Sequence, residues 1–142
     1  LDEAACPIIL TPHEGEFKRL GGDLSMGREK GALEFVKAHS CTLVLKGSGT
    51  VIAFGDGTLA RNTTGNPGMA KGGSGDVLAG MITALLGQKI PLKSAVSAAV
   101  WLHGRTGDLL CEELGEYSMT PTGKQAFNDH LSALERIIRT NK

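Results

Sequence analysis

A glycine-rich stretch that ends at an acidic residue could carry phosphoryl chemistry. Five of the eleven residues from Gly65 to Gly75 are glycines, and Asp76 follows them at the start of an apolar run. Glycine loses more conformational freedom on folding than any other residue, so such a stretch is expected where the backbone approaches a ligand closely. Peptide N–H groups in this kind of loop can converge on an anion, and the dipole of a following helix adds to the attraction. We therefore predict an anion hole made by the amides of Gly72, Gly73, Ser74 and Gly75.

Asp76 is the candidate catalytic residue beside this anion hole. Because a phosphate repels a carboxylate, Asp76 is a poor phosphate ligand, but it could take the proton from a hydroxyl group that attacks the phosphate. An unperturbed aspartate has a pKa of about 3.9 and is ionised at neutral pH. Phosphoryl transfer through a loose transition state needs mainly orientation and late proton capture. The alternative is that Asp76 only stabilises the first turn of a helix and the glycines form a tight turn, and the loop by itself does not decide between the two.

Two standard phosphate-binding patterns do not fit the glycine-rich stretch. A Walker A loop requires GxxxxGK[ST], but "GNPGMAKG" has Ala70 in place of the second glycine and Gly72 after the lysine. The dinucleotide-binding pattern GxGxxG is also absent, because "GSG" continues as "DVL". The remaining pattern is GGSGD at the start of a helix.

The elements that would position these residues alternate between strands and helices. A short buried strand in residues 7–13 leads into a loop that carries Thr11, Pro12 and His13. The apolar run "CTLVLKG" at 41–47 is typical of a strand buried on both faces, so Lys46 lies where a buried strand emerges, a usual place for ligand sites in α/β proteins. We further expect a hairpin within 51–62, a short helix within 15–22, and helices at 27–40, 76–88, 92–114 and 124–139, with Gly104 and Gly107 as weak points of the longest.

This alternation indicates a layered α/β fold. Four strands at most, two of them in a hairpin, are few for a closed three-layer sandwich. The chain also begins with Leu1 instead of Met. We therefore expect an upstream part of the same domain to be missing.

Composition excludes several classes of function. The 142 residues contain 15 acids and 15 bases, so the formal net charge is zero, which argues against nucleic-acid binding and against a membrane-surface patch. The three cysteines are widely spaced and include no CxxC, which disfavours a disulfide framework or a metal site and suits a reducing, cytoplasmic location. No signal peptide and no apolar run of membrane-spanning length is present.

Three motifs in this order closely resemble the ADP/ATP-dependent NAD(P)H-hydrate dehydratases: "TPHEGEF", "LKGSGTVIA" and "TGNPGMAKGGSGDVLAGMITALLGQ". This family belongs to the ribokinase-like superfamily and was formerly labelled carbohydrate kinases. GxGD alone would indicate only the superfamily, whereas "NPGMA" with "GGSGDVLAG" and "TPHEGE" is far more specific. The resemblance implies a ribokinase-like three-layer α/β/α sandwich, of which residues 1–142 form the C-terminal half of a single domain. The N-terminal half would be a separate polypeptide or a further segment, and since members are often oligomeric, the resemblance also implies a homo-oligomer.

The resemblance implies repair of NADH and NADPH whose nicotinamide ring has taken up water. ADP or ATP, with Mg²⁺ bridging its phosphates, phosphorylates the ring hydroxyl, and loss of phosphate restores the double bond. Carried over by motif position, His13 contacts the hydrated nicotinamide nucleotide, and Asp76 faces its hydroxyl as the base. The adenosine phosphate site is lined by Lys46, Gly47, Ser48, Gly49 and Thr50, and Gly75 contributes to the nucleotide and anion site.

Other interpretations remain open from the sequence. A ribokinase-like kinase for a sugar or vitamin precursor would use the same aspartate and loop but release a stable phosphate ester, and an inactive fragment would bind nucleotide without turnover. His13 could simply cap the following helix, and Lys46 could be a solvated lysine at a strand end. The histidines within helical patterns are expected to be structural or exposed, and Trp101 is expected to pack between helices.

Overall fold

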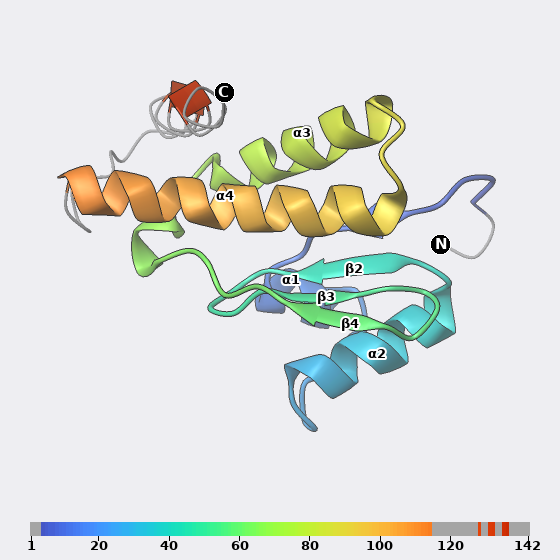
Figure 1. Ribbon diagram of the computed structural model, residues 1–142. Coiled ribbons are helices and arrows are strands. Elements are labelled where there is room, and N and C mark those ends of the chain that lie inside the picture. Colours follow the sequence, from blue (N-terminus) through green and yellow to red (C-terminus); the bar gives the residue numbers. More distant parts are fainter. Residues whose placement is uncertain (1–3, 115–127, 129–130, 133–134, 137–142) are drawn as a thin grey trace. The chain divides into compact units, whose positions relative to one another are not determined.

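The computed structural model describes residues 4–114, 128, 131–132 and 135–136 (Figure 1). The helix predicted at 124–139 therefore lies mostly outside the described residues. Two compact units divide the chain, Leu1–Asn62 and Thr63–Lys142. In the described residues, no helix combines the length and the apolar character needed to cross a membrane.

The first unit contains a four-stranded sheet in the order β1-β2-β3-β4. Strands β1 (Ile9–Leu10) and β2 (Thr42–Leu45) are parallel, whereas β3 (Val51–Ala53) pairs antiparallel with β2 and with β4 (Leu59–Arg61). The predicted strands and hairpin are thereby confirmed. In the hairpin turn, Gly57 has a φ of 84°, a conformation that glycine adopts without strain.

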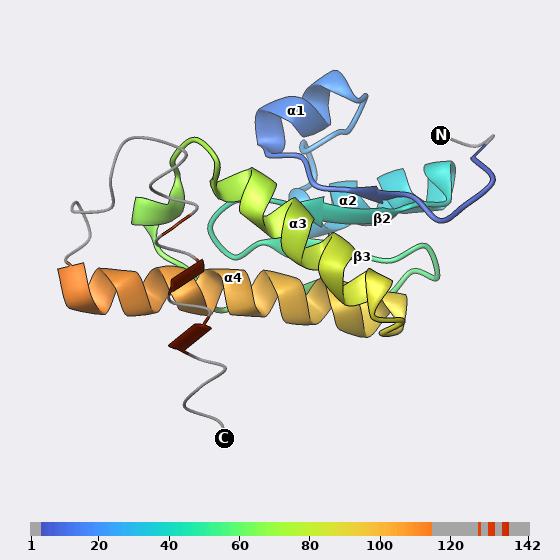
Figure 2. The same cartoon turned by 90° about the horizontal axis from the view of Figure 1, so that it is seen from above.

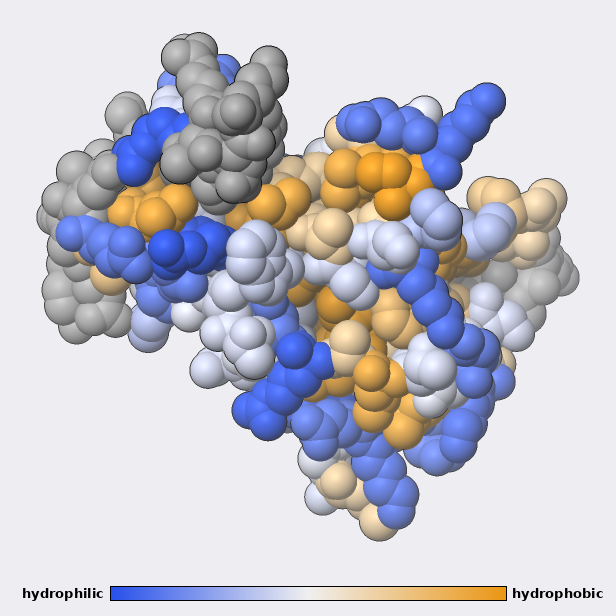
Figure 3. Space-filling view, in the orientation of Figure 1, coloured by the Kyte–Doolittle hydropathy of each residue, from blue (hydrophilic) through white to orange (hydrophobic). Residues whose placement is uncertain are grey.

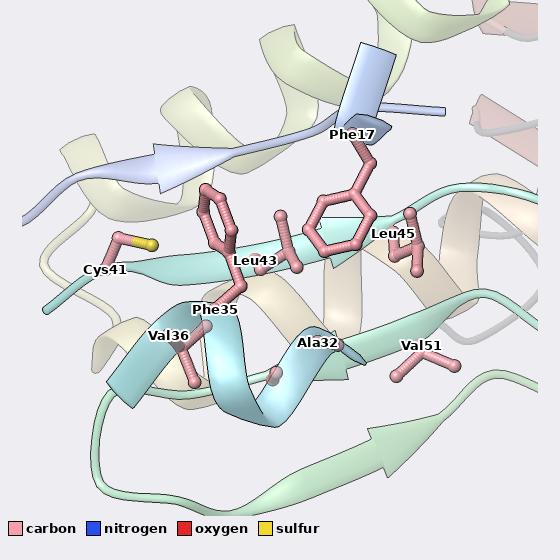
Figure 4. Close-up of a cluster of buried hydrophobic side chains, with 9 residues drawn as sticks. Phe17, Ala32, Phe35, Val36, Cys41, Leu43, Leu45 and Val51 are labelled. Carbon is pink, nitrogen blue, oxygen red and sulfur yellow. The ribbon is translucent and has the colours of Figure 1, made fainter. Parts of the chain in front are cut away.

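Two helices complete the first unit, α1 (Glu14–Arg19) and α2 (Arg28–His39). All four residues of β2 are buried, which confirms the two-sided burial predicted for this strand. The core cluster between helices and sheet is shown in Figure 4, where Phe17 of α1 and Phe35 of α2 meet edge to face with ring centroids 5.1 Å apart. Its remaining members are aliphatic or small: Ala32, Val36, Cys41, Leu43, Leu45, Val51 and Ala53.

The second unit consists of a 3₁₀ turn, η1 (Pro67–Met69), and two helices that pack on one another, α3 (Ser74–Gly87) and α4 (Leu92–Leu114) (Figures 1 and 2). The start predicted for α4 at residue 92 is confirmed, and the helix extends to Leu114, where the continuously described part of the chain ends. The start predicted for α3 was wrong by two residues, because Gly73 adopts a left-handed conformation (φ 89°) and makes Ser74 the first helical residue. Asp76 therefore lies within the first turn of α3.

Helix α3 is almost entirely apolar, and Asp76 is its single charged residue. On the face shown in Figure 3, hydrophobic side chains gather over the region that α3 occupies in Figure 1. On α4, Trp101 remains 48% exposed, so the packing role predicted for it is wrong for the described part of the chain.

Candidate functional site

His13 begins α1 as its N-terminal cap. Its Nδ1 accepts a hydrogen bond from the Glu16 amide at 3.1 Å, and its own backbone N–H donates to Glu16 Oε2 at 2.7 Å. This reciprocal pair is a capping box in which histidine takes the place usually held by serine or threonine. Because Nδ1 accepts, the hydrogen of a neutral ring is on Nε2, which lies 3.4 Å from Glu16 Oε1. The capping interpretation of His13 is therefore confirmed, and its half-exposed ring remains accessible to a ligand.

Lys46 directly follows β2 and lies beside His13. The two residues form an isolated parallel bridge, and the Lys46 amide donates to the Pro12 carbonyl at 2.8 Å. Parallel strands bring their carboxyl ends to the same edge of a sheet, which explains why two motifs far apart in the sequence meet here. Lys46 Nζ lies 3.7 Å from Glu16 Oε2, so the predicted lysine is paired with a carboxylate rather than simply solvated.

Glu16 connects these two predicted residues, and the sequence analysis missed it. The His13 backbone N–H bonded to the carboxylate lowers the pKa of Glu16, and the charge of Lys46 acts in the same direction. The available signal was the capping-box spacing, an acid three residues after a possible cap. A cavity of about 370 Å³ lies beside this cluster and is lined by Leu10, Thr11, Pro12, Glu16, Arg19 and Leu20.

The loop that follows Lys46 carries the remaining nucleotide-site candidates of the first unit. Gly47 and Gly49 have φ values of 147° and 62°, which favour glycine, and Thr50 Oγ1 donates to the Gly47 carbonyl at 3.1 Å. The amides of Gly47, Ser48 and Gly49 have no hydrogen-bond partner among the described residues. Arg28 donates to carbonyl oxygens of the same segment, and the sequence analysis did not single it out.

In the second unit, α4 holds the start of the glycine-rich stretch. Asp108 accepts a hydrogen bond from the Gly65 amide at 2.9 Å and another from Asn66 Nδ2 at 3.2 Å. Asn66 Oδ1 in turn accepts from the Gly68 amide at 3.1 Å and caps η1. Asn66 therefore shapes the loop, while Asp108, which anchors it, carried no sequence motif that we recognised.

Gly104 and Gly107, which were predicted as weak points of α4, do not interrupt the helix. The helix runs through both positions, and both are contact points for the loop. A Cβ at Gly104 would lie 2.8 Å from the backbone carbon of Thr64, and one at Gly107 would overlap the Met69 side chain. Thr64 Oγ1 also donates to the Trp101 carbonyl at 3.0 Å.

The predicted anion hole lies at the start of α3. The amides of Gly72, Gly73 and Gly75 have no hydrogen-bond partner among the described residues, whereas the Ser74 amide makes a long contact of 3.4 Å with the Lys71 carbonyl. The Ser74 carbonyl accepts from His103 Nε2 at 2.9 Å. His103 is buried, so its predicted structural role is confirmed, and it holds the first residue of α3 in place.

Asp76 is exposed in the first turn of α3. Its carboxylate makes no hydrogen bond or ion pair with another described residue. That freedom suits a base awaiting a substrate hydroxyl, and the position also suits the favourable interaction of an acid with a helix N-terminus. In the described residues, no group of three or more His, Cys, Asp or Glu side chains could hold a metal ion.

The predicted site residues thus form two clusters, one within each unit. The first unit brings together His13, Lys46 and the loop 47–50, joined by Glu16. The second unit places Asp76 beside residues 72–75, the predicted anion hole, on a backbone held by His103 and Asp108.

Known proteins are similar to this chain over most of its length. A family model described as NAD(P)H-hydrate dehydratase matches residues 1–126. A bifunctional NAD(P)H-hydrate repair enzyme of Thermofilum pendens is 44% identical over 124 residues, which is 84% of this chain and 24% of the relative. The ADP-dependent (S)-NAD(P)H-hydrate dehydratase of Bacillus subtilis is 44% identical over 117 residues, 80% of this chain and 42% of the relative.

Solved structures are also similar to this chain in both fold and sequence. The ADP/ATP-dependent NAD(P)H-hydrate dehydratase from Bacillus subtilis, co-crystallised with ATP and Mg²⁺, has a TM-score of 0.84 at 38% identity, covering 96% of this chain and 48% of that one. A ribokinase-like superfamily protein from Enterococcus faecalis has a TM-score of 0.72 at 33% identity, covering 91% of this chain and 46% of that one. The predicted ribokinase-like α/β fold is confirmed, and the chain spans about half of these solved relatives and less than half of the curated ones. From its motifs, its fold and this match over most of its length, the chain belongs to the NAD(P)H-hydrate dehydratase family.

Proposed function

We propose that this chain supplies the nucleotide-binding and phosphoryl-transfer part of an ADP- or ATP-dependent NAD(P)H-hydrate dehydratase. The observation that carries the proposal is that backbone amides are unpaired in two glycine loops, residues 46–50 and 72–75. In each loop several backbone amides lack hydrogen-bond partners among the described residues, while neighbouring groups of the same loop are anchored. Unpaired amides on an anchored backbone can stabilise phosphate charge without reorganising during the reaction.

The proposed reaction has two steps. In the first, Asp76 takes the proton of the ring hydroxyl, and the hydroxyl oxygen attacks the terminal phosphoryl group of the nucleotide, which leaves one phosphate shorter. The amides of Gly72, Gly73 and Gly75 would stabilise the charge on the transferred group. In the second step, the bond between the ring carbon and the ester oxygen breaks, and phosphate leaves with that oxygen and the electron pair of the bond. The adjacent ring carbon loses a proton, and the electrons of its C–H bond restore the double bond of NADH or NADPH.

The first unit would hold the two nucleotides. Residues 46–50 would bind the phosphates of ADP or ATP, with Lys46 exchanging its contact with Glu16 for a phosphate oxygen. His13 would contact the hydrated nicotinamide nucleotide with its half-exposed ring, next to the cavity that Thr11 and Pro12 line. Mg²⁺ would reach the site with the nucleotide and be coordinated mainly by phosphate oxygens, because the described residues offer no cluster of acidic ligands.

The test is an assay of the intact protein with NADH hydrate and with ADP or ATP, followed by the recovery of NADH absorbance. We expect nucleotide-dependent recovery in the wild type and a loss of turnover of at least about a hundredfold in Asp76→Asn, with nucleotide affinity within a few-fold, because general base catalysis typically contributes this much. Equal loss of affinity and turnover would contradict the role of Asp76 as the base.

The same assay separates the competing functions. A small-molecule kinase would leave NADH hydrate unchanged and convert an added alcohol to a stable phosphate ester. An inactive nucleotide-binding fragment would bind ADP or ATP equally well with and without the Asp76→Asn change and would turn over neither substrate. Either result would overturn the proposed dehydratase activity.

A further inference from the structure

We propose that Arg28 is a positioning residue that sets the backbone of the loop 46–50 for nucleotide binding. The inference rests on the proposed function of this loop and adds a residue outside the three motifs. Arg28 is the first residue of α2, and its side chain is 24% exposed. A cation at a helix N-terminus is disfavoured by the helix dipole, so the helix itself does not explain an arginine here.

The Arg28 guanidinium binds three carbonyl oxygens around the loop. Nη1 donates to the Ser48 carbonyl at 2.6 Å and to the Gly49 carbonyl at 3.3 Å, and Nη2 donates to the Leu45 carbonyl at 2.9 Å. The planar guanidinium fork can reach both ends of the loop at once, which the point charge of a lysine cannot. Hydrogen bonds from a charged donor are also stronger than neutral ones.

These contacts take up carbonyl oxygens and leave amides available. Peptide groups whose C=O points at Arg28 direct their opposite N–H groups away from it. The peptide groups of the Ser48 and Gly49 carbonyls carry the N–H groups of Gly49 and Thr50, and these two amides have no partner among the described residues. The N–H opposite the Leu45 carbonyl is that of Lys46, which donates to the Pro12 carbonyl. We infer that Arg28 keeps carbonyl oxygens away from the phosphates and presents N–H groups to them.

Arg28 acts through the loop rather than as a phosphate ligand. Besides the three carbonyls, its Nε lies 3.1 Å from Glu14 Oε1. This contact is an ion pair and not an aligned hydrogen bond, because Nε has no hydrogen-bond partner among the described residues. With its two terminal nitrogens already bound to the backbone, the side chain has little donor capacity left for a ligand.

The glycine at position 47 fits the same arrangement. A Cβ there would lie 2.8 Å from Arg28 Nη2. Gly47 is therefore required both by its φ of 147° and by the close approach of the guanidinium. Glu14 belongs to the motif that begins α1, so Arg28 also links that motif to the loop.

The test compares Arg28→Lys with two controls in the intact protein, using calorimetric titration with ADP and with ATP. Arg28→Lys keeps the charge but loses the fork, and we expect nucleotide affinity to fall about tenfold or more, the cost of losing hydrogen bonds from a charged donor. Arg61→Lys changes an exposed arginine beside the same loop, and Glu14→Gln removes only the ion pair. Both controls should remain within about twofold of the wild type, a range typical of exposed ion pairs.

Two further readouts separate loop positioning from a loss of stability. The KM for nucleotide should rise in Arg28→Lys with a smaller change in kcat, whereas a variant that only unfolds would lower the active fraction without raising KM. Hydrogen exchange at the Lys46 amide, which donates to the Pro12 carbonyl, should also be faster than in the wild type under native conditions. If the wild type binds nucleotide and Arg28→Lys binds within twofold of it, the positioning role is wrong and the proposed function stands. If the wild type binds neither ADP nor ATP, the proposed function fails and takes this role with it.

Discussion

At the scale of single residues, His13, Glu16 and Lys46 form one connected group at the carboxyl ends of two parallel strands. His13 and Glu16 satisfy each other's backbone amides, and Lys46 lies against the same carboxylate. Local capping and a ligand role are compatible for His13, because its Nδ1 is occupied while its ring remains half exposed. Glu16 is therefore the residue through which both candidates are oriented.

The lowered pKa of Glu16 predicts a pH dependence of stability. The His13 amide and the charge of Lys46 favour the ionised form, so the folded-state pKa lies below the ordinary value of 4.5. The contribution of Glu16 is therefore complete above that value and is lost as the pH falls through the lowered pKa. In urea unfolding followed through the acidic range, Glu16→Gln should lack this part of the acid destabilisation.

The control for Glu16→Gln is Glu34→Gln, which removes an exposed carboxylate paired with Lys37 along α2. We expect its acid profile to follow that of the wild type, because an isolated exposed pair of this kind contributes little. An unchanged profile in Glu16→Gln would contradict the assigned contacts of Glu16.

At the scale of elements, α4 positions the glycine-rich loop by contacts along one side. The loop contacts the helix at three places. Thr64 donates to the Trp101 carbonyl, Asn66 donates to the Asp108 carboxylate, and Met69 lies against Gly107. His103 then holds the carbonyl of the first residue of α3. The helix thus anchors both ends of the stretch that leads to Asp76, and glycines that cost helix propensity make this close approach possible.

Replacing Gly104 with alanine should lower the stability of the protein, whereas the same change in a helix interior normally raises it. In a helix interior alanine is normally more stable than glycine by roughly 1 kcal/mol. Gly104→Ala should instead destabilise by about 1–3 kcal/mol, because its Cβ would meet the Thr64 backbone at 2.8 Å and backbone cannot move aside cheaply. Urea unfolding of the variant measures this difference.

Gly80→Ala in α3 is the matched control, since a Cβ at Gly80 meets no atom within 4 Å. We expect this change to leave stability unchanged or to raise it by up to about 1 kcal/mol. Stabilisation by both substitutions would show that the loop does not approach α4 as closely as described.

At the scale of the whole molecule, the site candidates divide between two compact units. The first unit has its own hydrophobic core around Phe17 and Phe35, and the second is built on the packing of α3 against α4. Each unit contributes one loop with unpaired amides. A nucleotide that binds either loop stabilises the folded state by mass action, since the unfolded chain has no such loop.

We therefore predict that ADP or ATP at a hundred times its dissociation constant raises the free energy of unfolding by about 2.7 kcal/mol. Thermal or urea unfolding of the intact protein with and without nucleotide measures the shift. Adenosine, which lacks phosphate, is the control ligand and should stabilise far less, because the unpaired amides recognise anions. Equal stabilisation by adenosine would contradict phosphate recognition by these loops.

Much of the secondary structure followed from the sequence because its signals are local. The buried run of β2, the glycine turn between β3 and β4 and the apolar periodicity of α3 and α4 each predicted an element that the structure contains. The three motifs likewise pointed to the family without a structure. Boundaries were less secure, since the first residue of α3 depends on the left-handed conformation of Gly73, which the amino-acid type permits but does not require.

Only the tertiary structure decided which distant residues support the site. The contacts of Arg28 with Ser48, and of His103 with Ser74, join positions 20 and 29 residues apart, and neither arginine nor histidine carries a local signal of its partner. The same holds for Gly104, which alone in a sequence indicates a weak helix and in the fold admits the Thr64 backbone. Local propensity and periodicity determine elements, whereas side-chain contacts across elements depend on where the folded backbone brings those elements together.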